Sequence, residues 1–288
     1  MKTSVSSYSF GHYGSQNELG MLGIIDKTKE MGFDGIEFAA DDWWFNDEEM
    51  LKRMRERCEK NSLPVVNVAV GADFLNGSGG DLEREIEETC KKVDKAAILG
   101  SMMMRHDATG GFSFEQKTAI GYDDALPRLV EGCRRVTEYA KERGIMTLTE
   151  NHGFFSQDSV RVEKLINSVA NDNFGALVDV GNFLCADDDP NIAVGRIGRL
   201  ARHVHVKDFF VKSGMEPNPG AGWFQSRGGY YLRGTIVGHG DARVFQSLKS
   251  LKWNGYDGFV SIEFEGIEDN LMGISIGLEN LKRFFAMI

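Results

Sequence analysis

Four acidic or imidazole side chains each close a short, apolar, β-branched run of the sequence. They are Glu150 in TLTENHG, Asp179 in ALVDVGN, His205 in RHVHVKD and Glu263 in FVSIEFE. Helix-like sequence follows the first three after a loop, which is typical of strands in βα units. The carboxyl ends of the strands converge in a parallel barrel, so we expect the four side chains to meet. Three carboxylates and one imidazole suit Mn²⁺, Mg²⁺ or Co²⁺ better than a structural zinc ion.

The alternation of side chains along a strand supports this arrangement. His203, His205 and Lys207 share one face of their strand, and valines occupy the other face. Helices cover the outer face of a barrel, so the polar face points inward, where ionised carboxylates are costly without a cation. Two alternatives stay open: His203, one pleat deeper, competes with His205, and Glu265 competes with Glu263 for the ligand position.

Three further polar residues near strand ends are candidates for contacts with a substrate. His152 lies just beyond Glu150 on the same face, where it would orient a substrate or shuttle a proton, or else bond to the loop backbone. Lys207 points toward the mouth and would neutralise a developing oxyanion, or else pair with a neighbouring carboxylate. His106 ends its strand in MMMRHDATGG and would contact the substrate, or else pair within the RHD cluster.

The elements that must position these residues alternate along the whole chain. Strands are predicted near residues 3–10, 35–38, 65–70, 101–105, 145–150, 176–179, 202–207 and 258–264, and helices near residues 16–31, 47–61, 81–99, 122–143, 156–170, 191–199 and 270–285. Short strands alternating with helices indicate βα units and a parallel sheet. Because no Pro- or Ser-rich linker divides the chain, we predict one domain over residues 1–288, a (β/α)8 TIM barrel.

Two loops refine this prediction. A doubly wound open sheet, the competing architecture, usually carries GxGxxG after its first strand, and GHYGSQ does not fit that pattern. The longest interruption, residues 209–240, is rich in Gly and aromatic residues (GAGWFQSRGGYYLRG). A long loop at that place predicts a lid or an interface between subunits, so we expect a dimer or a tetramer.

The overall composition excludes several classes of partner. A net charge of −10 over 288 residues argues against a large nucleic-acid footprint, which needs clustered Lys and Arg. The four cysteines form no CxxC pair and are expected to be reduced thiols. No apolar stretch approaches the length that spans a bilayer. We therefore expect a cytoplasmic protein that binds no nucleic acid and no membrane.

Six motifs in order along the chain carry a family resemblance. They are GFDGIEF, ENHG, VDVGN, HVHVKD, VGHGDARVFQSL and GYDGFVSIEFEG. Together they resemble the xylose isomerase-like TIM barrel superfamily, in particular its sugar phosphate isomerase/epimerase members. The resemblance covers nearly the whole chain, and it is specific for the superfamily rather than for a substrate.

The resemblance implies a metal and a mechanism. One divalent ion would be held by Glu150, Asp179, His205 and Glu263, with Mn²⁺ as first choice and Mg²⁺, Co²⁺ or Zn²⁺ as alternatives. Glu150 and Glu263 would also be the catalytic acid and base. One glutamate would remove a carbon-bound proton, the metal would stabilise the enediolate oxygen, and the other glutamate would return a proton. The implied function is a sugar or sugar-phosphate isomerase or epimerase acting on a small carbohydrate.

Asn182 departs from the pattern of the ketose 3-epimerases within this superfamily. Those enzymes usually carry a histidine three residues after the aspartate that corresponds to Asp179. Asn182 can hydrogen-bond a substrate hydroxyl but cannot exchange a proton near neutral pH. We therefore expect Asn182 to bind substrate alongside His106, His152 and Lys207, and a simple 3-epimerase assignment is in doubt.

Three other functions compete with the isomerase prediction. A lyase on the same scaffold, inosose dehydratase-like or C-glycoside-cleaving, would use the same metal and base, with His152 as the acid for the leaving group. An endonuclease IV-like DNA repair enzyme would need more than six histidines for its zinc cluster and a basic DNA-binding face, which the charge of −10 disfavours. A non-catalytic binding protein on the same fold is the fourth reading.

Overall fold

The computed structural model describes residues 1–13, 19–40, 43–112 and 120–288. Eight parallel strands of these residues close a barrel in the order β1-β11-β7-β6-β5-β4-β3-β2. Their bounds are β1 (Lys2–Ser6), β2 (Gly35–Ala39), β3 (Val65–Val70), β4 (Met103–His106), β5 (Met146–Glu150), β6 (Phe174–Asp179), β7 (Ala201–Val206) and β11 (Phe259–Ile262). The predicted single-domain (β/α)8 barrel is therefore confirmed.

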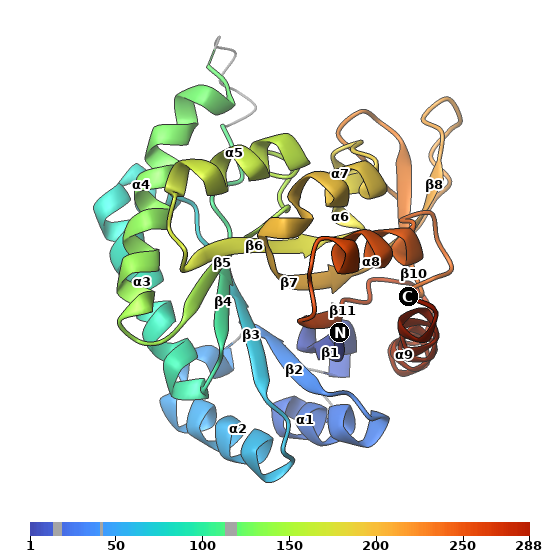
Figure 1. Ribbon diagram of the computed structural model, residues 1–288, viewed down its shortest axis with the longest axis horizontal. Helices are drawn as coiled ribbons and strands as arrows, with labels where there is room; N and C mark the ends of the chain where they lie inside the picture. Colours follow the sequence, from blue (N-terminus) through green and yellow to red (C-terminus); the bar gives the residue numbers. More distant parts are fainter. Residues whose placement is uncertain (14–18, 41–42, 113–119) are drawn as a thin grey trace.

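Helices surround this barrel as an outer ring (Figure 1). Their bounds are α1 (Gly20–Met31), α2 (Glu48–Lys60), α3 (Leu82–Leu99), α4 (Tyr122–Lys141), α5 (Ser159–Val169), α7 (Pro190–Ile197), α8 (Val244–Trp253) and α9 (Asn270–Met287), and a short α6 (Asn182–Cys185) follows β6. Aspartate side chains accept backbone N–H groups at the starts of several helices and so fix where each begins. These caps are Asp47, Asp81, Asp158, Asp189 and Asp269.

Several predicted boundaries are wrong at strand and helix ends. Strand β1 ends at Ser6 rather than at residue 10, because a 3-10 segment, η1 (Ser7–Tyr13), follows it. Helix α5 begins at Ser159 rather than at residue 156, since the Asp158 carboxylate caps it. Strand β11 ends at Ile262 rather than at residue 264. The predicted start of the first helix, at residue 16, lies outside the described residues.

The segment predicted as a long loop after β7 instead forms a small antiparallel sheet. Its strands are β8 (Asp208–Lys212), β10 (Tyr231–Thr235) and β9 (Phe224–Gln225), paired in the order β8-β10-β9. This sheet projects from the barrel near α6 and α7 (Figure 1). The segment has no regular hydrophobic period, and its pairing depends on an anchor distant in sequence, so sequence patterns did not reveal it.

Asp208 is that anchor. Its buried carboxylate accepts backbone N–H groups from Phe209, Gly238, Gly240 and Ala242, at 2.9–3.0 Å. The turn before α8 is thereby held against the start of β8. Residue 240 must be glycine, because a Cβ there would lie 2.4 Å from the Asp208 carboxylate. The aspartate of HVHVKD is therefore a structural residue of the fold.

The barrel strands separate an apolar outer face from a polar interior. Val204, Val206 and Val260 are fully buried beneath the helices, and each such side chain contributes roughly 1.5–3 kcal/mol by leaving water. The alternate positions, including His203 and His205, face the barrel interior and are equally buried. None of the described helices combines the length and the apolar character needed to cross a membrane.

Candidate metal centre

The structure brings the four strand-end residues together at one point, hereafter the cluster. Glu150 ends β5, Asp179 ends β6, His205 lies near the end of β7, and Glu263 follows β11. One ligand atom from each lies within 4.8 Å of all the others. His205 Nδ1 lies 3.4 Å from Glu263 Oε2, 3.6 Å from Glu150 Oε1 and 3.8 Å from Asp179 Oδ2. The imidazole nitrogen therefore faces three carboxylate oxygens.

Glu37 of β2 holds the far side of the His205 ring. His205 Nε2 lies 2.8 Å from Glu37 Oε1, and His203 Nε2 lies 2.7 Å from Glu37 Oε2. Burial opposes the charge of Glu37, but the two histidines lower the pKa of its carboxyl below the ordinary range. The ionised carboxylate accepts from both rings, so His205 Nε2 carries a proton. Burial opposes a positive charge on His205, but Glu37 and Glu263 raise the pKa of its imidazole well above the ordinary value. A cation bound in the cluster would take the place of the proton at Nδ1.

This arrangement separates the two histidines that competed for the ligand position. His203 sits one layer deeper, where its Nε2 also lies 3.1 Å from the Ser261 hydroxyl, itself 2.6 Å from the Ser4 hydroxyl. Glu37 lies at hydrogen-bond distances of 2.7–2.9 Å from both rings. Glu37, His203 and His205 also form a second group whose ligand atoms lie within 4.8 Å of one another, below the cluster. Sequence reasoning missed Glu37, although a charged residue between Ile36 and Phe38 in GFDGIEF signals an inward-facing position.

Arg105 of β4 holds Glu150, and sequence reasoning missed it as well. Its Nε donates to Glu150 Oε2 at 2.6 Å, and Asn182 Nδ2 donates to Glu150 Oε1 at 3.0 Å. The backbone N–H of Asn182 also donates to Asp179 Oδ1 at 2.8 Å. Burial opposes ionisation of Glu150, but Arg105 and His205 lower the pKa of that carboxyl well below its ordinary value.

His106, predicted to contact a substrate, is not brought to the cluster. Its buried ring lies between Phe74 and Phe174, with ring centroids 5.5 and 6.1 Å away, on the face of β4 opposite Arg105. Burial lowers the pKa of His106 to about 4, which suits this apolar packing. Methionines occupy both faces of the strand in MMMRH, so the sequence does not show which alternate positions face the barrel interior. It therefore did not indicate that Arg105 points inward.

Lys207 reaches into the cluster from just beyond β7. Its Nζ lies 2.6 Å from Glu263 Oε2, 3.0 Å from Glu265 Oε1 and 3.6 Å from Asp179 Oδ2. Burial opposes the positive charge, but these carboxylates raise the pKa of Lys207 well above its ordinary value. Glu265, the alternative to Glu263, therefore pairs with Lys207 and lies outside the group of four.

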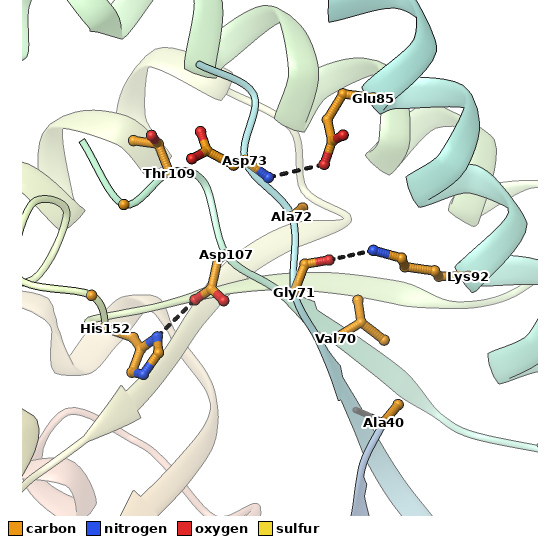
Figure 2. Close-up of a pocket in the computed structure, with 12 residues that line it drawn as sticks. Ala40, Val70, Gly71, Ala72, Asp73, Glu85, Lys92, Asp107, Thr109 and His152 are labelled. Atoms are coloured by element: carbon orange, nitrogen blue, oxygen red, sulfur yellow. Dashed lines mark hydrogen bonds and ion pairs between the residues drawn. The ribbon is translucent and has the colours of Figure 1, made fainter. Parts of the chain in front are cut away.

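His152 stands at the mouth of the barrel, at the carboxyl ends of its strands. Its Nδ1 lies 3.0 Å from Asp107 Oδ1, and its side chain is 47% exposed. Two cavities meet there, one of about 490 Å³ over β2 to β5 (Figure 2) and one of about 280 Å³ beside Lys207 and Asn182. His152 and Gly153 line both cavities, so this loop divides the mouth.

The donor set of the cluster fits a divalent cation. Asp179 Oδ2 and His205 Nδ1 are buried without a hydrogen-bond partner, and both belong to the group of four. Burial, reinforced by Glu150 and Glu263, raises the pKa of Asp179 to about 7, because three carboxylates cannot all ionise at close range without compensation. A cation among these atoms would coordinate both of the unpartnered ligand atoms and stabilise the ionised carboxylates.

Comparisons with known proteins agree with this fold. The family described as Xylose isomerase-like TIM barrel matches residues 25–284. The uncharacterized protein MJ1311 of Methanocaldococcus jannaschii is 20% identical over 281 residues, which cover 90% of this chain and 84% of that protein. The inosose dehydratase of Clostridium perfringens is 26% identical over 140 residues, which cover 48% of this chain and 46% of that enzyme.

Solved structures share the barrel at low sequence identity. The D-psicose 3-epimerase of Clostridium cellulolyticum H10, determined with D-tagatose, superposes with a TM-score of 0.76. It is 16% identical, and the match covers 99% of each chain. At that identity the likeness establishes the fold, and the chemistry must come from the side chains of the cluster.

Proposed function

Because this chain belongs to the xylose isomerase-like TIM barrel family, we propose that it is a divalent-metal-dependent isomerase or epimerase of a small ketose-like substrate. The observation that carries the proposal is the position of two glutamates. Glu150 Oε1 and Glu263 Oε2 lie 3.6 and 3.4 Å from His205 Nδ1 and so face a common point. Two carboxylates around one reacting carbon provide a base on one side and an acid on the other.

Glu150, Asp179, His205 and Glu263 are the proposed metal ligands. When bound, a divalent ion there would act as a Lewis acid toward a substrate carbonyl and make the neighbouring C–H more acidic. Mn²⁺ is the expected ion because oxygen ligands dominate the set. This ion, a dimeric or tetrameric assembly and a cytoplasmic location stay predictions.

The surroundings of the two glutamates suit proton transfer. A base must be ionised, and Arg105 and Lys207 favour the ionised forms of Glu150 and Glu263 respectively. Lys207 is also a donor for an oxyanion that develops at the substrate, since its ammonium lies beside Glu263 and Asp179. The side-chain amide of Asn182 donates a hydrogen bond to Glu150. A substrate hydroxyl beside Asn182 would therefore meet a neutral amide rather than a group that exchanges protons.

A lyase that eliminates water is the second candidate function. It is favoured by Asn182, which cannot return a proton, and by the His152–Asp107 pair, which places a proton donor at the mouth. After the same C–H proton is removed, an acid at the mouth would protonate a departing β-hydroxyl group. The similarity to an inosose dehydratase over 140 residues agrees with this candidate.

Proton exchange in D₂O tests the proposed function. The Mn²⁺-loaded protein is incubated with ketoses, ketose phosphates and inososes, the metal is removed, and loss of the C–H signal is followed by NMR. We expect deuterium in the substrate or its epimer with the native chain and none with Glu150→Gln. An unsaturated product would select the lyase, and an exchange rate unchanged in Glu150→Gln would refute the role of this glutamate.

A further inference from the structure

The cavity over β2 to β5 has a chemical character that bears on the substrate. It occupies about 490 Å³, within the usual range for small-molecule sites. Alanine and glycine residues form much of its wall, which leaves the space open. Its polar side chains are those of Asp73, Glu85, Lys92, Asp107, Thr109 and His152. Figure 2 shows Glu85 and Lys92 reaching it from α3, on the side away from Asp107 and His152.

Among the described residues that line this cavity, carboxylates outnumber cations. Asp73, Glu85 and Asp107 face a single ammonium, that of Lys92, and the excess persists even if His152 is protonated. Lys92 uses one of its N–H groups within the wall, because its Nζ donates to the Gly71 carbonyl at 2.6 Å (Figure 2). A phosphate in this cavity would therefore meet like charges, which costs binding free energy.

Two of the three carboxylates already serve the local fold. Asp73 Oδ1 accepts the backbone N–H groups of Leu75 and Asn76, each at 3.0 Å. Glu85 accepts the backbone N–H of Asp73 at 3.0 Å and the Ser78 hydroxyl at 2.7 Å. These bonds fix the rim of the cavity. Asp107 instead bonds the side chains of Arg105 and His152, so it is the lining carboxylate that connects the cavity to the cluster.

Asp107 is tied to the cluster through Arg105. The Arg105 guanidinium bonds Glu150 Oε2 at 2.5–2.6 Å and lies 3.3 Å from both oxygens of Asp107. Asp107 therefore stands one side chain away from a proposed catalytic glutamate. Among the described residues, the His152 ring forms a hydrogen bond only with Asp107, through Nδ1. Its Nε2 is therefore available to a ligand at the mouth. A substrate held at the cluster would extend past these two residues into the cavity.

We propose that this cavity binds the polyhydroxylated, uncharged end of the substrate, with Asp107 and His152 as partners for its hydroxyl groups, and that it disfavours phosphorylated sugars. The inference rests on the proposed function, because it assumes that the reacting end of the same substrate lies at the cluster. A carboxylate that accepts from hydroxyls forms charge-assisted hydrogen bonds, which are the stronger kind. The substrate class is thereby an unphosphorylated sugar or cyclic polyol ketone.

Equilibrium binding of matched probes tests this inference. Isothermal titration calorimetry on the Mg²⁺-loaded chain compares D-fructose, D-tagatose and D-xylulose with their terminal phosphates, and scyllo-inosose is added as a cyclic probe. We expect at least one uncharged probe to bind, and to bind about tenfold or more tightly than its phosphorylated partner where one exists. Tighter binding of the phosphates, or no binding by any uncharged probe, would overturn the inference.

Variants locate the binding within the cavity. Asp107→Asn should weaken the uncharged probe about tenfold and leave Mn²⁺ affinity within about twofold, because the lost partner lies outside the cluster. Glu87→Gln is the matched control, since this exposed carboxylate lies on α3 outside the cavity lining, and it should leave probe affinity within about twofold. Equal losses in Asp107→Asn and Glu87→Gln would contradict the role of Asp107.

A charge added to the wall provides a second readout if Asp107→Asn folds poorly. Ala72→Lys places an ammonium on the partly buried rim of the same cavity. It should improve binding of the phosphorylated probes about tenfold and leave metal affinity unchanged. Unchanged phosphate binding in Ala72→Lys would contradict the proposed position of the ligand.

The outcomes separate this inference from the proposed function. If an uncharged probe binds in a way that depends on Asp107 but no proton exchange occurs in D₂O, the cavity is a binding site and the proposed isomerase activity is refuted. If proton exchange is faster with a phosphorylated substrate, the proposed isomerase activity is supported and the proposed role of the cavity is refuted.

Discussion

The two sides of the His205 ring have opposite characters. On the inner side, Glu37, His203, Ser261 and Ser4 form a network on β1, β2, β7 and β11, and all of these residues are fully buried. On the outer side, the mouth group of Arg105, Asp107 and His152 begins on β4 and ends on loops, and its His152 side chain is 47% exposed.

The inner network and the mouth group therefore have different roles, one in holding a metal ligand and the other in selecting a substrate. The inner network cannot touch a substrate, so it can act only by fixing the orientation of a ligand ring. The mouth group contacts both Glu150 and an open cavity, so it can select what reaches the glutamates. Changes on the inner side should therefore alter metal binding, and changes at the mouth should alter substrate binding.

The largest expected effect comes from the cluster that both sides share. Glu263→Gln removes a proposed acid or base and should lower the rate of deuterium exchange by about 10³-fold, within the range for general acid–base groups. Exchange is measured by NMR with the best substrate of the D₂O panel. Glu265→Gln is the matched control, because Glu265 pairs with Lys207 outside the group of four, and its rate should change by less than about fivefold. Reversed magnitudes would exchange the roles of the two glutamates.

The second largest effect is expected from a substitution that disrupts the inner network, Glu37→Gln. In Glu37→Gln the side-chain amide can accept from only one of the two histidine rings, so His205 loses its fixed orientation. Mn²⁺ affinity should fall about 10–100-fold, as is usual when the partner of a metal-binding histidine is removed. Titration followed by electron paramagnetic resonance measures this without turnover. Substrate affinity of the fully metal-loaded variant should stay within about threefold of the native value, and a larger loss would show that the two sides are not separate.

The smallest effect would sharpen the role of the mouth. His152→Phe keeps a ring but removes both hydrogen-bonding nitrogens, so KM should rise about tenfold while kcat changes little and Mn²⁺ affinity is unchanged. Steady-state kinetics of the native chain and the variant supply the comparison. A fall in kcat of about 10²-fold or more would instead mark His152 as an acid and favour the lyase.

The inner and outer sides also differ in how far the sequence predicts them. Glu150, Asp179, His205 and Glu263 could be found because each ends an apolar strand and the strands had to converge. Their partners were harder to find, since a contact between β2 and β7 depends on the barrel's closure rather than on any local pattern. Arg105 was missed because its strand is apolar on both faces, and the parity that places His106 outward is visible only after folding.

The sheet of β8, β9 and β10 marks the limit of prediction in the fold itself. Its position is fixed by Asp208, whose partners Gly238, Gly240 and Ala242 lie some thirty residues later in the chain. Such a pairing leaves no periodic signal in the sequence, whereas each βα unit of the barrel carries its own.

Anomalous diffraction from a crystal grown with Mn²⁺ would test the central claim most directly. One anomalous peak is predicted about 2.1–2.2 Å from His205 Nδ1, with oxygens of Glu150, Asp179 and Glu263 in the same shell. The hydrogen bonds that the two histidine rings donate to Glu37 should remain in place. A peak between Glu37 and His203, or no peak at the cluster at saturating Mn²⁺, would contradict the account.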